Sequence, residues 1–238
     1  MPGMRGVSAI LVVVGLLTGG PALRPFDKLR VAPSPVEGRQ AQGTPSASRG
    51  EKAAREPDRE VPPVFRVRLD TTKGPIVIAV HRGWAPHGAD RFHELATAKY
   101  FDDSRFFRVV KRQWAQFGIA GDPALAAWWR TRRIPDDPPQ QSNVRGRVAF
   151  AFKDPGGRTS QIYISLRDNS YQDTQGFVPF GEVVEGMNVA DALNSEYGER
   201  SGGGIRAGEQ QPLFDGGNAF LDREYPRLDR LRTARVIR

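Results

Sequence analysis

Residues 106–122, with the sequence FFRVVKRQWAQFGIAGD, contain the side chains best suited to act on a ligand. Val109 and Val110 follow Arg108, and this mixture of apolar and charged residues predicts a strand that buries most of its side chains. Gln116 comes eight positions after Arg108. Arg108 either covers apolar surface with its stem while its head stays in water, or presents its forked donors to a ligand. On this stretch alone the first alternative is favoured, because arginine stems often pack in that way.

The rest of the sequence offers few groups for acid–base, nucleophilic or metal chemistry. His81, His87 and His93 have no partnered serine or cysteine and no spacing typical of a metal site, so we interpret them as structural or surface residues. The sequence has no acidic metal-loop motif and no cysteine, so neither a metal nor another cofactor is predicted. The glycine run at 202–204 lacks the flanks of a phosphate-binding loop and predicts a flexible connection. Electrostatics and shape remain as means of action.

The chain is basic, with a formal net charge of +8, which raises the question of a nucleic-acid partner. The densest basic cluster is Arg130, Arg132 and Arg133, beside Trp128 and Trp129, and such a cluster would suit stacking and phosphate binding. Elsewhere the arginines are dispersed, and many alternate with acids. One cluster without a recognisable module favours the solvated face of a loop or short helix, so no nucleic-acid partner is expected.

The first sixty residues differ in composition from the rest. Residues 7–17 form a continuous apolar run after one basic residue, which predicts a signal peptide or a short membrane-anchor-like segment over residues 1–20. A transmembrane helix needs about 20 apolar residues, so the run is too short for one. The alternative is a mispredicted start or a buried strand. Residues 21–62 are rich in Pro, Gly, Ser and Arg, lack apolar periodicity, and predict a disordered linker.

These N-terminal features predict where the protein acts. A leader followed by a flexible linker indicates an exported chain, periplasmic or otherwise extracytoplasmic. If the leader is not cleaved, it would tether the folded part to the membrane. Because the chain has no cysteine, a lipidated N-terminal cysteine is excluded.

Residues 63–238 are predicted to form one folded domain. The alternating or helical spacing of apolar residues predicts strands at 64–69, 75–80, 146–152, 161–166, 177–184 and 234–237, and helices at 88–99 and 187–195. The turn at 71–74 lacks Asn-Gly, so its loop is expected to exceed two residues. Residues 123–143 form a proline-rich, charged excursion without a clear period. Many short strands with two helices predict a closed antiparallel barrel with helix-covered ends.

Seven blocks of sequence occur in an order typical of one known family. They are TTKGPIVIAV, WAPHGADRF, YFDDSRFFRVV, QFGIAGDP, RGRVAFA, TSQIYI and FVPFGEVVEGMNV, spread over residues 64–195. In this order the chain resembles the cyclophilin-type peptidyl-prolyl cis-trans isomerases, and QFGIAGDP resembles a bacterial branch of them. The resemblance implies a mainly β fold, a closed eight-stranded antiparallel β-barrel capped by two α-helices.

The family rotates the peptide bond before proline, so the resemblance implies an isomerase that assists protein folding. The barrier to this rotation is about 20 kcal/mol, because amide resonance is lost on twisting. An enzyme lowers it by binding the twisted imide more tightly than the planar one. Arg108 occupies the position of the arginine that hydrogen-bonds around the prolyl amide, and Gln116 that of a nearby glutamine, so both are expected to be catalytic. The implied partners are proline-containing segments of client proteins, bound by a monomer.

The resemblance also implies a set of substrate-binding residues. These are Phe106, Gln113, Trp114, Ala151, Phe152, Gln161, Tyr163, Tyr171, Gln172 and Phe177. Tyr163 stands where the family has a phenylalanine, whereas Gln113 and Gln172 replace a phenylalanine and a leucine. Each of the two glutamines removes apolar contact worth about 1–3 kcal/mol. They favour an alternative function, a proline-peptide-binding or chaperone module with weak or no isomerase activity.

Overall fold

The structure is a computed structural model that describes residues 61–202 and 210–238 of the 238-residue chain. The leader predicted over residues 1–20 and nearly all of the linker predicted over residues 21–62 lie outside the described residues, so both stay predictions. The first strand begins at Val64. Within the described ranges, no helix is both long enough and apolar enough to span a membrane.

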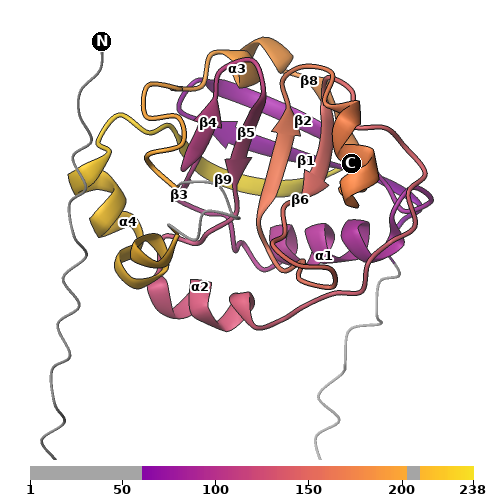
Figure 1. The fold of residues 1–238 in the computed structure, drawn as a ribbon, viewed down its shortest axis with the longest axis horizontal. Helices are drawn as coiled ribbons and strands as arrows, with labels where there is room; N and C mark the ends of the chain where they lie inside the picture. Colours follow the sequence, from indigo (N-terminus) through magenta and orange to yellow (C-terminus); the bar gives the residue numbers. More distant parts are fainter. Residues whose placement is uncertain (1–60, 203–209) are drawn as a thin grey trace, which may run out of the picture. The chain divides into compact units, whose positions relative to one another are not determined.

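A nine-stranded antiparallel sheet forms the body of the described chain (Figure 1). Its strand order is β3-β9-β1-β2-β8-β6-β7-β5-β4. The strands are β1 (Val64–Thr71), β2 (Gly74–His81), β3 (Ser104–Arg105), β4 (Arg108–Val110), β5 (Trp114–Phe117), β6 (Arg147–Phe150), β7 (Ile162–Ser165), β8 (Pro179–Glu185) and β9 (Arg230–Ile237). The mainly β, antiparallel fold predicted from the sequence is confirmed.

The two ends of the strand order are neighbours along the chain. Only Phe106 and Phe107 separate β3 from β4. Phe106 still follows β3, since its backbone N–H donates to the carbonyl of Asp229, just before β9, at 3.0 Å. Counted as one interrupted strand, β3 and β4 give the eight strands that the family resemblance implies. The interruption brings the ends of the curled sheet together and places Arg108 at the start of β4.

The hairpin between β1 and β2 is tighter than the sequence predicted. Thr71 pairs with Gly74, so the loop contains only Thr72 and Lys73, and the prediction of a longer loop was wrong. Gly74 adopts a φ of 124°, a conformation open to glycine at little cost. The turn is also held from outside, because the Thr72 hydroxyl donates to Asp229 Oδ1 at 2.6 Å. A contact with a residue far along the chain thus stabilises a two-residue turn that the local sequence did not predict.

Four α-helices and one short 3-10 helix accompany the sheet in the part of the chain that the structure describes (Figure 1). They are α1 (Pro86–Thr97), α2 (Pro123–Arg130), η1 (Ser170–Gln175), α3 (Met187–Asp191) and α4 (Gln211–Glu224). α1 matches the helix predicted at 88–99. The helix predicted at 187–195 is shorter and ends at Asp191. α2 and α4 are two helices more than the sequence predicted.

α2 lies in the excursion for which the sequence showed no period. Asp122 caps it, since its carboxylate accepts the backbone N–H of Ala124 at 2.8 Å, and Pro123 fills the first turn. α4 packs against α2 and is kinked at Gly217, whose φ is 51°. The next residue, Asn218, donates its backbone N–H to the carbonyl of Gly121 at 2.9 Å. The kink therefore docks α4 on the segment that leads into α2.

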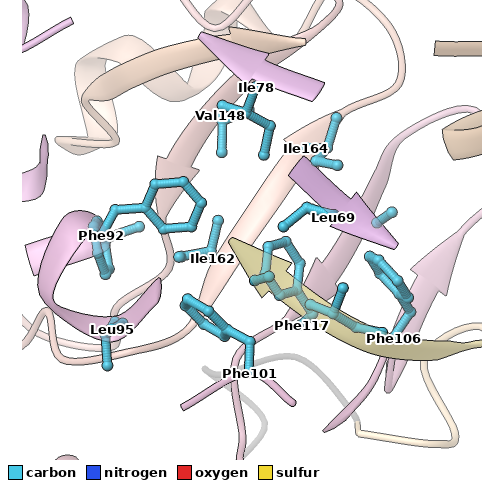
Figure 2. Close-up of a cluster of buried hydrophobic side chains, with 14 of the residues drawn as sticks. Leu69, Ile78, Phe92, Leu95, Phe101, Phe106, Phe117, Val148, Ile162 and Ile164 are labelled. Atoms are coloured by element: carbon cyan, nitrogen blue, oxygen red, sulfur yellow. The ribbon is translucent and has the colours of Figure 1, made fainter. Parts of the chain in front are cut away.

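Phenylalanine rings fill the space that the sheet encloses (Figure 2). Phe117 of β5 is fully buried, with its ring centroid 5.5 Å from that of Phe101 and 5.2 Å from that of Phe106. Isoleucine and leucine side chains from the strands surround these rings, including Leu69 and Ile162. This apolar core holds the strands whose ends carry the polar residues of the site.

We expect Phe117→Ala to lower the free energy of unfolding by about 3–5 kcal/mol, because a fully buried ring is removed and a cavity remains. Chemical denaturation followed by tryptophan fluorescence measures this loss. The matched control is Val184→Ala on β8, at a side chain that is 44% exposed, and it should change the stability by less than about 0.5 kcal/mol. Equal losses in the two variants would contradict the core shown in Figure 2.

Candidate active site

A pocket of about 290 Å³ lies where β4, β5 and β7 meet η1. The segments after β6 and before β8 complete its wall. The lining residues are Arg108, Trp114, Gln116, Ala151, Phe152, Tyr163, Tyr171, Gln172, Gln175 and Phe177. All of them except Gln175 belong to the site residues implied by the sequence. Residues up to 69 positions apart therefore converge on one cavity, as the resemblance implied.

Three of the implied residues, Phe106, Gln113 and Gln161, do not line the pocket. Phe106 is fully buried and packs against Phe117, because it continues the core-facing end of β3. Gln113 lies in the turn between β4 and β5, where its backbone carbonyl accepts N–H groups from Leu166 at 2.9 Å and Asn169 at 2.8 Å. Its side chain does not line the pocket. A polar residue at position 113 therefore does not remove an apolar wall from this cavity.

Arg108 is held from three directions. Its Nη1 donates to Gln116 Oε1 at 2.9 Å, across the β4–β5 pair. Its Nε and Nη2 each donate to a carboxylate oxygen of Glu199 at 2.7 Å. The guanidinium carbon lies 4.8 Å from the centre of the Trp114 ring, within the range of a cation–π contact. Arg108 therefore does not extend freely into water but is a fixed group in the pocket wall.

Gln161 also lies outside the pocket lining, but it supports the residues that form it. Gln116 Nε2 donates to Gln161 Oε1 at 2.8 Å, and Gln161 Nε2 donates to Gln210 Oε1 at 2.8 Å. Gln210 in turn donates to the carbonyl of Gly202 at 3.4 Å. A chain of side-chain amides thus runs from the catalytic candidates to the segment before α4.

Tyr163 forms a nearly buried part of the wall. Its hydroxyl lies 2.7 Å from Asn143 Oδ1 and 3.0 Å from the side-chain amide of Gln172. Burial raises the pKa of Tyr163 well above its ordinary value, and the nearby carboxylate of Asp173 raises the pKa further. The hydroxyl therefore stays protonated at neutral pH. Two polar departures from the family pattern, Tyr163 and Gln172, satisfy one another here.

Aromatic rings form the apolar part of the pocket. The ring centroids of Phe152 and Phe177 are 4.6 Å apart, and the Tyr163 ring meets Phe177 edge-on at 5.7 Å. Ala151 and Trp114 add apolar surface beside them. The pocket combines an apolar surface with one fixed cation.

Three residues of the site were not foreseen from the sequence. Gln175 lines the pocket, Glu199 pairs with Arg108, and Gln210 ends the amide chain. Gln175 is the last residue of η1, in a polar stretch of sequence without a motif. Glu199 is 91 positions from Arg108 and lies, like Gln210, after the last family block, so no local signal connected them.

The histidines lie away from this cavity. His81 stacks on Trp84 with ring centroids 4.0 Å apart, and His93 meets Phe65 edge-on at 5.0 Å. Burial lowers the pKa of His93. Among the described residues, no group of three or more His, Cys, Asp or Glu side chains could hold a metal ion.

The basic cluster of the sequence lies on and just after α2. Arg132 stacks on the Trp128 ring, and Arg130 lies 4.0 Å from the centre of the Phe214 ring. Trp128 is half-exposed, whereas Trp129 is buried. The cluster therefore lies on the solvated face of a short helix, one of the two places predicted from the sequence.

Comparisons with known proteins agree with this fold. The model of the family described as cyclophilin type peptidyl-prolyl cis-trans isomerase/CLD matches residues 66–211, more than half of the chain. The chain is 33% identical over 134 residues to peptidyl-prolyl cis-trans isomerase-like 1 of Rhizopus delemar, which covers 53% of this chain and 78% of that protein. It is 28% identical over 145 residues to a peptidyl-prolyl cis-trans isomerase of Acinetobacter baylyi, covering 56% of this chain and 75% of that protein.

Solved structures share the fold. The crystal structure of a cyclophilin type peptidyl-prolyl cis-trans isomerase of Cryptosporidium parvum aligns with a TM-score of 0.53 at 16% identity, over 74% of this chain and 98% of that one. A second structure of that protein, in the presence of the dipeptide Ala-Pro, gives a TM-score of 0.51 at 18% identity, over 73% and 99% of the two chains. The fold thus defines a cyclophilin-like protein. The chain belongs to the cyclophilin-type peptidyl-prolyl cis-trans isomerases, and the family resemblance in its sequence is confirmed.

We expect Tyr163→Phe to lower the free energy of unfolding by about 1–3 kcal/mol, because Asn143 and Gln172 lose a buried hydrogen-bond partner. Thermal and chemical denaturation measure this. The double variant Tyr163→Phe, Gln172→Leu should recover part of the loss, since it removes both members of one polar pair. Tyr171→Phe, at a side chain that is 49% exposed, is the control and should change little. A double variant less stable than Tyr163→Phe would show that the two groups do not satisfy one another.

Proposed function

We propose that this protein isomerises X-Pro peptide bonds through Arg108 and thereby assists the folding of client proteins. The observation that carries the proposal is the position of Arg108. It lies in the wall of an aromatic-lined pocket, with its guanidinium fixed by Gln116 before any substrate arrives. A donor fixed in advance can stabilise the transition state without reorganising at the moment of reaction.

The mechanism needs no nucleophile, because no covalent bond is made or broken. Rotation requires the prolyl amide to lose its resonance, which accounts for a barrier of about 20 kcal/mol. A guanidinium has five N–H donors. Three of those on Arg108 bind Gln116 and Glu199, which leaves two for the prolyl amide. These donors hydrogen-bond the twisted amide, while Phe152 and Phe177 hold the ring.

The substrates that we propose are proline-containing segments of other polypeptides. The Cryptosporidium relative was crystallised in the presence of Ala-Pro, which supports a short proline peptide as the minimal ligand of this fold. The reaction uses only side chains of the protein, so we propose that it requires neither a cofactor nor a nucleic acid. We propose that the protein acts as a monomer, since one chain supplies every residue of the pocket.

We propose further that the protein acts outside the cytoplasm. The support is the apolar run at residues 7–17, followed by a linker-like composition up to residue 62. An uncleaved leader would tether the domain to the membrane. Fractionation of cells that produce the full chain, with and without residues 1–20, tests this. Recovery of both forms in the cytoplasm would refute export.

A second candidate function is a proline-peptide-binding or chaperone module with weak isomerase activity. The observation that favours it is Gln172, a side-chain amide in the pocket wall where the family has an apolar residue. Titration with proline peptides separates the two functions. Binding without acceleration of cis-trans exchange would favour the binding module.

Arg108→Ala is expected to lower kcat/KM for a proline peptide by about a hundredfold or more, because it removes the donors that act on the twisted amide. A protease-coupled or NMR exchange assay measures this loss. Arg66→Ala is the matched control, since Arg66 is an exposed strand arginine remote from the pocket lining, and it should leave the rate unchanged. Equal rates for the wild type and Arg108→Ala would refute an arginine-centred mechanism.

A further inference from the structure

Glu199 binds Arg108 without forming part of the pocket. Its two carboxylate oxygens accept N–H groups from Nε and Nη2, each at 2.7 Å. Gln116, which accepts from Nη1, lines the pocket, whereas Glu199 does not. The guanidinium is therefore held along one edge by a carboxylate outside the cavity and at Nη1 by an amide inside it. We propose that Glu199 is a positioning residue for Arg108, an inference that rests on the proposed isomerase function.

The segment that carries Glu199 is fastened beside the arginine. Ser201 is fully buried, and its hydroxyl donates to the carbonyl of Phe107, the residue before Arg108, at 2.6 Å. Gly202 lies so close to the same residue that a Cβ atom there would come within 2.5 Å of the Phe107 ring. Only glycine fits this approach without a shift. Glu199 is thus two residues from a buried anchor, which restricts where its carboxylate can lie.

Residues 199–202 are also connected to Arg108 through a second set of hydrogen bonds, which begins at Nη1. The amide chain that begins at Nη1 passes through Gln116, Gln161 and Gln210 and ends on the carbonyl of Gly202. Residues 199–202 therefore contact Arg108 directly through Glu199 and indirectly through the amides. A guanidinium held at both places cannot rotate without breaking hydrogen bonds on both sides.

Positioning is the role that this geometry supports. A free arginine side chain loses rotamer freedom when it engages a substrate, and that loss opposes catalysis. An arginine that is already fixed avoids this cost in the transition state. The Glu199 side chain is 52% exposed, so water screens its charge and Arg108 keeps its strength as a donor. We therefore expect the effect of Glu199 in kcat rather than in KM.

The kinetic test compares two carboxylates on one segment. Glu199→Ala is expected to lower kcat for a proline peptide about tenfold with KM changed less than twofold. Glu199→Gln keeps one acceptor and should lose less. Glu196→Ala removes the carboxylate that pairs with Arg227 instead, and should match the wild type. An unchanged kcat in Glu199→Ala would refute the proposal. A raised kcat would refute it too, because the carboxylate would then compete with substrate.

A spectroscopic test separates this proposal from the proposed function. The Arg108 Nε–H proton can be followed by 1H–15N NMR, assigned with Arg108→Lys. In Glu199→Ala its signal should move and exchange faster with water, while Glu196→Ala should leave it in place. An unchanged Nε–H signal in Glu199→Ala would refute the role of Glu199 in holding Arg108, whatever the activity. If the Nε–H signal depends on Glu199 but the wild type does not accelerate isomerisation, the isomerase function is refuted. The role of Glu199 in catalysis is then refuted with it.

Discussion

A guanidinium can only donate hydrogen bonds, and this constraint orders the polar groups behind the pocket. Because Arg108 donates to Gln116, that amide must turn its oxygen toward Arg108 and its nitrogen toward Gln161. The same reasoning fixes Gln161 and then Gln210, whose nitrogen ends on the carbonyl of Gly202. All three amides are therefore aligned in one direction, and aligned hydrogen bonds strengthen one another. One charge thus determines the orientation of three uncharged side chains.

The backbone on both sides of Arg108 is also held in place, beginning at the break between β3 and β4. Phe106 and Phe107 are both fully buried, whereas Arg108 reaches the pocket. The Phe107 carbonyl, which lies between β3 and β4, accepts the Ser201 hydroxyl at 2.6 Å. Two consecutive buried rings hold the chain to the core on one side of the arginine, and the β4–β5 pair holds it on the other. Burial of the two rings and hydrogen bonding to β5 together fix the backbone position of Arg108.

Much of this structure could be predicted from the sequence, because strands leave local signals and the family resemblance implied the residues of the pocket. Alternation located β1 and β2, and family blocks supplied nearly the whole pocket lining. α2 was not predicted because its eight residues show little helical periodicity. α4 was not predicted because Gly217 interrupts its helical pattern. Gln113 was placed in the pocket by position alone, and only the turn geometry shows its side chain outside the lining. Glu199 pairs with Arg108 across 91 positions, and the periodicity of a sequence does not predict contacts between residues so far apart.

β9 gives the fold an order of assembly. It lies between β1 and β3, and its first residue, Arg230, meets Thr72 across 158 positions of sequence. Closing so long a loop costs more conformational entropy than forming the β1–β2 hairpin, so we expect β9 to dock after the local hairpins. In the described chain β3 pairs with β9 alone, and only Phe106 and Phe107 separate β3 from Arg108. The residues just before Arg108 therefore gain their strand partner only when β9 docks, whereas the β4–β5 pair that carries Arg108 and Gln116 is local and can form earlier.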